Sequence, residues 1–280
     1  MEEMYGIKYL KPKVVLLQET GIGVAETAAR TCYDSFCNSE NDVVQKLETI
    51  LPDEKMCKSL NNIEESQLLD DLAWTYFHHS ILEHVNLTYL IKGTSRGVLQ
   101  EHARHRIQAI SVRSTRYTMS SVLNAYVASL SIHNRDSRFK FFFQKIDVDS
   151  LLVTKGHYNT FEVQSILSKL DFQRKQIGDE EFFKLAIAKS SLKYLTETDP
   201  DVLFDMLQNG KSKRNVGDSF KHIVSDNWKV DMVVTFNLRS LKNYFQLRDS
   251  GAAYFGIRWL AQAMKEVTPS KYLDLIVKQH

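Results

Sequence analysis

Proline and cysteine are both scarce in this sequence of 280 residues, which contains four prolines and three cysteines. Without a proline-rich stretch or an internal repeat there is no obvious linker, so we predict one domain over residues 1–280. The cysteines Cys32, Cys37 and Cys57 are odd in number and lack CxxC spacing. They therefore argue against a disulfide framework and predict reduced thiols in a cytoplasmic protein.

Long apolar runs and an excess of either charge are also missing. The first residues, MEEMYGIKYLKPK, lack the apolar core of a leader, and no segment approaches the roughly 18 apolar residues that a membrane span needs. Lysine and arginine total 36 against 34 aspartates and glutamates. Such a balance predicts no membrane partner, and it argues against binding nucleic acid through overall charge.

The hydrophobic pattern predicts a mixed α/β fold. Residues 13–18 (KVVLLQ) are typical of a strand that leads through a glycine turn into a helix, and residues 85–92 alternate as a half-buried strand does. Residues 93–95 should end that strand, with Ser95 capping a following helix. Further elements are predicted as helices over 96–106, 237–248 and 252–267 and a strand over 232–237.

The turn GIGVAE, residues 21–26, invites comparison with a dinucleotide-binding fingerprint. Glu26 stands where that fingerprint has its third glycine. Two glycines after a strand are more often a tight turn, and we favour that interpretation.

The stretch RHRIQAISVRSTRY, residues 104–117, has four arginines and no acid. It could bind nucleic acid, direct nuclear import, form a salt-bridged surface or hold the phosphates of a small ligand. Interleaved apolar residues such as Ile107 and Ile110 predict partial burial, which disfavours the first two. Because a partly buried arginine cluster needs an anion, and the guanidinium fork suits phosphate, we favour a phosphate ligand.

Two further segments carry polar side chains at helical spacing. In HHSILEH, residues 78–84, only His79 and Glu83 have zinc-ligand spacing, so we predict no metal and favour a core or cofactor-contacting histidine. In NLRSLKNYFQLR, Arg239 and Asn243 share one helix face near an N-terminus that favours anions.

These three segments together resemble the flavin-dependent thymidylate synthases. That family has an R-H-R-x7-S motif with a closing R-Y, matched by 104–106, Ser114 and Arg116-Tyr117. It also has H-x-S-x-x-E-H, matched by 78–84, and N-x-R-x3-N-x4-R, matched within 237–248. The resemblance implies an α/β (α+β) fold, with a central, mainly antiparallel sheet flanked by helices. Residues near 38–74 and 125–215 look like helical insertions into it.

The resemblance also implies an enzyme that converts dUMP to dTMP. Methylenetetrahydrofolate would supply the carbon, NADPH the reducing equivalents and bound FAD the hydride chemistry. Arg248 would be catalytic by favouring ionisation of uracil N3, without a cysteine nucleophile. The family is homotetrameric. The implied dUMP contacts are Glu101, Arg104, Ser114, Thr115, Arg116, Lys221 and Arg248. The implied FAD contacts are His78, Ser80, Arg104, His105, Arg106, Asn237, Arg239 and Asn243.

Three positions depart from the family pattern. Ser111 and Val112 replace an Asn-Glu pair, and Lys221 replaces an arginine, which keeps the charge but not the fork. A non-catalytic nucleotide- or RNA-binding relative is the alternative, and an FAD enzyme with another acceptor is a second. The arginines lack the interleaved aromatics of a base-stacking surface, which argues against RNA.

Overall fold

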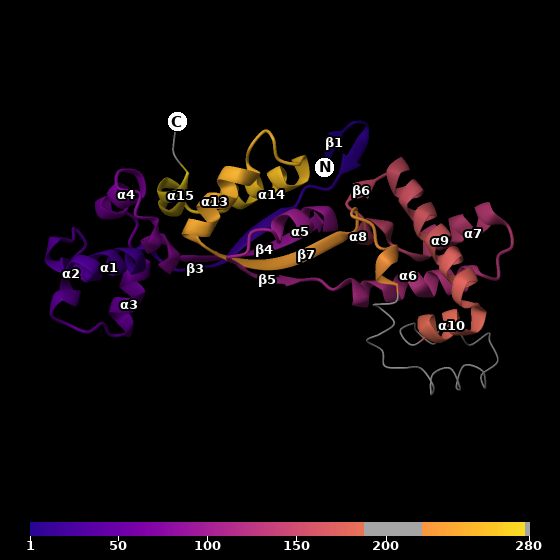
Figure 1. Ribbon diagram of the computed structural model, residues 1–280, viewed down its shortest axis with the longest axis horizontal. Helices are drawn as coiled ribbons and strands as arrows, with labels where there is room; N and C mark the ends of the chain where they lie inside the picture. Colours follow the sequence, from indigo (N-terminus) through magenta and orange to yellow (C-terminus); the bar gives the residue numbers. More distant parts are fainter. Residues whose placement is uncertain (188–219, 278–280) are drawn as a thin grey trace. The chain divides into compact units, whose positions relative to one another are not determined.

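The computed structural model describes residues 1–187 and 220–277, which form two compact units (Figure 1). Unit 1 contains Met1–Leu10, Ser95–Gly97 and Arg113–Val230, and unit 2 contains Lys11–Thr94, Val98–Val112 and Asp231–His280. The single domain with insertions stays a prediction. The second expected insertion falls in unit 1, and its residues 188–215 lie outside the described chain.

Helices and strands are mixed along the sequence (Figure 1). The strands are β1 Glu2–Met4, β2 Ile7–Tyr9, β3 Lys13–Glu19, β4 Asn86–Ser95, β5 Ala109–Val112, β6 Thr154–Lys155 and β7 Lys229–Asn237. The α-helices before residue 130 are α1 Ile22–Tyr33, α2 Asp42–Gln45, α3 Glu54–Asn61, α4 Gln67–Trp74, α5 Arg96–His102 and α6 Thr115–Ser129. Those after it are α7 Arg135–Lys145, α8 Val148–Leu151, α9 His157–Ile177, α10 Asp179–Ile187, α13 Leu238–Arg248, α14 Phe255–Glu266 and α15 Ser270–Ile276. The 3-10 helices are η1 Phe36–Asn38, η2 Lys46–Glu48, η3 His79–His84 and η5 Lys221–Ile223.

A four-stranded sheet in the order β3-β4-β7-β5 carries the core of unit 2. Strand β3 pairs antiparallel with β4, with Val14 opposite Ile91, and β5 pairs antiparallel with β7, with Ile110 opposite Val234. Every second residue of β7 is buried, because one face of the sheet is covered by helices while the other is not. Helix α14 packs on β3 and on α13. The predicted antiparallel sheet with flanking helices is confirmed, and so are the strands over 13–18, 85–92 and 232–237.

The glycine turn after β3 allows two helices to approach closely. A Cβ added to Gly21 would lie 2.2 Å from the Cα of Asn61, and one added to Gly23 would lie 2.4 Å from the carbonyl oxygen of Leu60. The Gly21 N–H also donates to Asn61 Oδ1 at 3.1 Å. Packing of α1 against the end of α3 therefore explains these glycines, which agrees with the tight turn favoured from the sequence.

The buried carboxylate of Glu26 completes this corner of unit 2. Its two oxygens accept from Ser39 Oγ at 2.6 Å and Asn41 Nδ2 at 2.8 Å, and Arg30 Nε lies 3.6 Å away. A buried carboxylate is tolerated because both oxygens are hydrogen-bonded. Glu26, which stands where the dinucleotide fingerprint has its third glycine, thus holds the segment after α1 in place.

The prediction that residues 93–95 end the strand is wrong, because β4 runs through Ser95. Gly93 has a φ of 78°, a conformation that glycine adopts without strain. Its N–H donates to Asp231 Oδ1 at 2.9 Å, so a side chain of β7 satisfies the irregular residue and the strand continues.

The helix predicted over 96–106 ends at His102, so the arginines of the RHR motif lie in the loop beyond it. A short strand that the pattern did not predict, β5, follows this loop and pairs with β7 at the edge of the sheet. The expected partial burial holds for Ile110, which is 37% exposed on the edge strand, but it is wrong for Ile107, which is 69% exposed in the loop before that strand.

Unit 1 combines a small sheet, in the order β1-β2-β6, with a helical core. The helices bury aromatic side chains such as Tyr126, Phe142 and Phe182. Arg138 forms an ion pair with Asp171 at 2.8 Å, and Tyr126 donates to the same carboxylate at 2.6 Å.

No helix in the described ranges is long and apolar enough to cross a membrane.

Candidate active site

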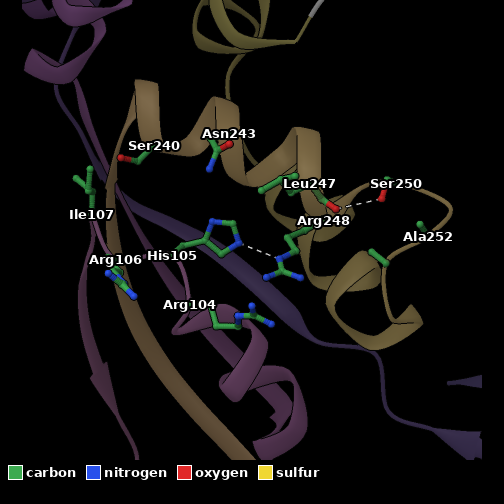
Figure 2. A pocket seen from close by; sticks show the side chains of 11 residues that line it. Arg104, His105, Arg106, Ile107, Ser240, Asn243, Leu247, Arg248, Ser250 and Ala252 are labelled. Atoms are coloured by element: carbon green, nitrogen blue, oxygen red, sulfur yellow. Dashed lines mark hydrogen bonds between the residues drawn. The ribbon is translucent and has the colours of Figure 1, made fainter.

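A cavity of about 740 Å³ lies in unit 2 between the loop after α5 and one side of α13 with the loop that follows it (Figure 2). Its size is in the usual range for a small-molecule site. It is lined by Arg104, His105, Arg106, Ile107, Ser240, Asn243, Leu247, Arg248, Ser250, Ala252 and Ala253. The RHR motif and the N-x-R-x3-N-x4-R motif, more than a hundred residues apart in the sequence, therefore meet at one site.

Arg248 is held by three hydrogen bonds at the end of α13. Its Nε donates to His105 Nε2 at 2.8 Å (Figure 2), one terminal nitrogen donates to Glu101 Oε2 at 2.8 Å, and the other donates to the Glu101 carbonyl at 3.2 Å. Because a guanidinium has five N–H groups, two remain for a ligand. The cation is therefore fixed in position and still able to donate.

His105 is an acceptor in this arrangement, so its Nε2 carries no proton. Burial, followed by the neighbouring Arg248 guanidinium, lowers the pKa of His105 below its ordinary value, while Glu101 opposes the shift. The imidazole ring also packs edge-on against Tyr244, with ring centroids 4.8 Å apart. The structure thus favours a neutral imidazole that orients Arg248.

A buried pair beneath the loop supports this geometry. His102 is fully buried, and its Nδ1 forms a hydrogen bond of 3.0 Å with the hydroxyl of Tyr244. Its ring packs against Phe236 and Tyr244. Burial, followed by the nearby His105, lowers the pKa of His102 to about 4. Sequence reasoning missed His102, because nothing in the pattern distinguishes a buried histidine at a helix end.

The neutral His102 predicts loss of stability in acid. The unfolded chain binds a proton near pH 6.5 and the folded chain only near pH 4, so the free energy of unfolding falls as pH drops through this window. We expect a loss of about 2 kcal/mol between pH 7 and pH 5 from this residue. Urea unfolding at both pH values should show a smaller loss in His102→Gln, and an unchanged loss would contradict this origin.

Arg104 and Arg106 are exposed at the cavity, on either side of His105 (Figure 2). In the parts of the chain that the structure describes, neither guanidinium forms an ion pair. Two such forks beside Arg248 make the cavity strongly positive. Their geometry suits an anionic ligand with several oxygen acceptors, as phosphate groups provide.

A second cavity of about 420 Å³ lies at the other end of α13 and contains the H-x-S-x-x-E-H segment. Arg239 Nη1 forms an ion pair with Glu83, which fixes the guanidinium at the cavity while leaving it 54% exposed. The glutamate of the H-x-S-x-x-E-H motif therefore orients an arginine of the N-x-R-x3-N-x4-R motif. The cavity is lined by Ala29, Cys32, Tyr33, Leu72, Phe77, His78, His79, Ser80, Ile81 and Arg239.

His79 is held by contacts within the protein. Its Nε2 lies 3.0 Å from the Ala73 carbonyl oxygen and 3.2 Å from Lys242 Nζ. The Lys242 ammonium also lies over the ring of Trp74, 3.8 Å from its centroid, and burial lowers the pKa of this lysine. These contacts agree with the first of the two interpretations favoured from the sequence, a core histidine, and its contact with a cofactor stays a prediction.

The remaining predicted FAD contacts on α13 have different surroundings. Asn243 is exposed at the first cavity, next to the newly found lining residue Ser240. Asn237 caps the helix, since its Oδ1 accepts from the Ser240 N–H at 2.8 Å. Its place in the motif is therefore explained by capping, and its contact with a cofactor stays a prediction.

Several predicted nucleotide contacts belong to unit 1. Ser114 precedes α6, Thr115 is buried at the start of that helix, and Lys221 is exposed in η5. The side chain of Arg116 lies outside the described part of the chain. Their roles stay predictions.

Two of the three positions that depart from the family pattern, Ser111 and Val112, lie on β5 in unit 2. Ser111 pairs with Val233 and Val112 with Met232, and both side chains are exposed. Neither is among the residues that line the two cavities described above.

The fold and the positively charged site define an α/β protein that binds an anionic small molecule, and comparison with known proteins identifies its family. Residues 15–271 match the model of the family described as Thymidylate synthase complementing protein. The chain therefore belongs to this family.

Named relatives and a solved structure agree with this membership. The flavin-dependent thymidylate synthase of Campylobacter jejuni strain RM1221 is 28% identical over 264 residues, covering 93% of each chain. That of Wolinella succinogenes is 25% identical, covering 92% of this chain and 94% of the relative. Thymidylate synthase X from Helicobacter pylori, solved with FAD and dUMP, superposes with a TM-score of 0.58. At 22% identity it covers 95% of this chain and 97% of its own, which confirms the fold.

Proposed function

We propose that this protein is a flavin-dependent thymidylate synthase, which methylates dUMP to dTMP. Methylenetetrahydrofolate provides the carbon and NADPH the reducing equivalents. The observation that carries the proposal is the cavity in which Arg104, Arg106 and Arg248 converge from two family motifs. Family membership and relatives named for this reaction support it. FAD, when bound, supplies the hydride transfer.

Arg248 is the catalytic residue in this proposal. The two N–H groups that its three hydrogen bonds leave available donate to the uracil ring. A cation at this position stabilises the ring in its N3-deprotonated form, which increases electron density at C5, where the methyl group is added. His105 and Glu101 prevent the guanidinium from rotating away.

The residues predicted from the family motifs divide between the nucleotide and the cofactor. Arg104, Ser114, Thr115, Arg116 and Lys221 are proposed to join Glu101 and Arg248 in holding dUMP. His78, Ser80, Arg104, His105, Arg106, Asn237, Arg239 and Asn243 are proposed to hold FAD. The exposed guanidiniums of Arg104, Arg106 and Arg239 support this, because FAD carries two phosphates for them to neutralise.

We further propose a cytoplasmic homotetramer whose ligands are these small molecules rather than nucleic acid. The exposed apolar side chains at the cavity, Ile107 at 69% and Leu247 at 53%, support burial against another copy of the chain. The balance of 36 basic and 34 acidic residues argues against a general attraction to nucleic acid.

The purified protein is expected to be yellow, or to become so when FAD is added. Release of tritium from the C5 position of dUMP should require both NADPH and methylenetetrahydrofolate. Absorbance near the flavin band and the tritium-release assay measure these two properties separately. A protein that cannot bind FAD would refute the proposal, whereas flavin binding without turnover would favour a non-catalytic relative.

A further inference from the structure

Gln108, the second residue after the RHR motif, closes the loop that carries that motif. Its Nε2 donates to the carbonyl oxygens of His102 at 3.0 Å and of His105 at 2.7 Å. The His105 N–H also donates to the His102 carbonyl at 3.1 Å. One side chain therefore ties the end of α5 to the middle of the loop.

The orientation of this amide follows from its surroundings. The opposite orientation would place Oε1 against two carbonyl oxygens, which have no hydrogen to donate. In the observed orientation Oε1 is buried without a hydrogen bond of ordinary length, although Gln108 also interacts with the His102 side chain and opposes the lowering of its pKa. Leaving a buried acceptor unpaired is unfavourable, so the two bonds made by Nε2 must outweigh that cost.

Of the two residues that hold Arg248, His105 is the more sensitive to a change in this loop. Arg248 has two supports, Glu101 on helix α5 and His105 in the loop. Glu101 is fixed by the helix, whereas the His105 backbone after α5 is held by the turn that Gln108 closes. Loss of the Gln108 bonds would therefore release the imidazole first.

We propose that Gln108 is a positioning residue that holds the His105 imidazole as the acceptor for Arg248. Gln108 is not among the residues that line the cavity, so it acts through His105. The position of the ring is a property of the protein alone. Its consequence for turnover rests on the proposed thymidylate synthase function.

The titration of His105 in the ligand-free protein tests the position of the ring. The groups that face it are Arg248 and Tyr244 from α13, Glu101 and His102 from α5, and Arg104 from its own loop. In Gln108→Leu, which keeps the bulk but has no donor, the released imidazole becomes hydrated and moves away from Arg248. The pKa of His105, followed by NMR, is then expected to rise toward its ordinary value.

Matched variants separate this role from a general loss of stability. Gln262→Leu removes a surface amide that donates to Asp249 at 3.1 Å, and it should leave the titration of His105 unchanged. Gln108→Asn, which keeps the donor on a shorter side chain, is the second variant if Gln108→Leu does not fold. The pKa of its His105 is expected to lie between the wild-type value and the ordinary value. An unchanged pKa of His105 in the folded Gln108 variants would overturn the proposal.

Turnover provides the second measurement. We expect kcat of Gln108→Leu to fall about fivefold, the factor that one hydrogen bond of ordinary net strength provides. If the pKa of His105 in Gln108→Leu equals that of the wild-type protein while turnover is reduced, the positioning role would be overturned. Absence of flavin binding and turnover in the wild-type protein would refute the proposed function instead, while the ligand-free titration would still decide the role of Gln108.

Discussion

Replacing Arg248 with alanine is expected to lower kcat by about 10²–10³-fold while FAD remains bound, the loss seen when one preorganised donor to a developing anion is removed. Alanine removes the only cation that is held by both His105 and Glu101 among the described contacts of the site. It also leaves the Glu101 carboxylate unpaired beside the uracil, where a negative charge opposes deprotonation of N3.

Flavin binding should survive this substitution, because Arg104, Arg106 and Arg239 remain. Arg248→Lys keeps the charge but cannot make the three bonds at once, so its turnover should lie between those of the wild type and Arg248→Ala. Arg258→Ala removes a guanidinium from α14 that lines neither cavity described above, and its turnover should be unchanged. Tritium release and flavin absorbance are measured for all three.

Wild-type turnover in Arg248→Ala would remove this residue from the mechanism. Loss of turnover together with loss of FAD would show instead that Arg248 holds the cofactor or the fold. A reduced kcat with an unaltered flavin spectrum is the only result that supports its action on the uracil ring.

The sequence was sufficient to predict three strands of the four-stranded sheet and two of the motifs whose residues line the first cavity. Alternation identifies β4 and β7 because each buries one face, and the motif spacing places Arg239, Asn243 and Arg248 along one helix. The cavity brings Arg104–Arg106 to the same place. The strands are visible in a single sequence as local periodicity, whereas the association of the motifs was expected only from the family resemblance.

Features that depend on contacts distant in sequence could not be predicted. The continuation of β4 past Gly93 needs Asp231 from another strand, and the early end of α5 is stabilised by Gln108. Ile107 is exposed because it lies in the loop between α5 and the edge strand β5, a placement that its apolar sequence does not reveal. His102 is buried only because Phe236 and Tyr244 pack on it from β7 and α13.

The glycines at residues 21 and 23 illustrate how the structure decides between two interpretations of one motif. A cofactor-binding turn requires glycine so that a phosphate can approach the backbone. A packing turn requires glycine so that another segment of the protein can approach the backbone. At Gly21 the approaching atoms are the Cα, carbonyl carbon and carbonyl oxygen of Asn61, which belong to the protein itself.

Gly21→Ala is therefore expected to lower the free energy of unfolding by about 3 kcal/mol, the upper part of the range for inserting atoms into a packed site. The backbone of Gly21, with φ −61° and ψ 152°, is accessible to alanine, so the cost is steric and not conformational. The added Cβ would lie 2.2 Å from backbone that cannot rotate away, and α1 must move from the end of α3. Urea unfolding with a constant m-value measures the loss.

Gly251→Ala is the matched control, because an added Cβ there meets nothing within 4 Å. It should leave stability within about 0.5 kcal/mol of the wild type, as surface substitutions do. The two interpretations of the turn then predict opposite results for Gly21→Ala. A packing turn loses stability, and the protein that remains folded still binds FAD. A cofactor turn would keep its stability and lose the flavin, and that outcome would contradict the packing explanation.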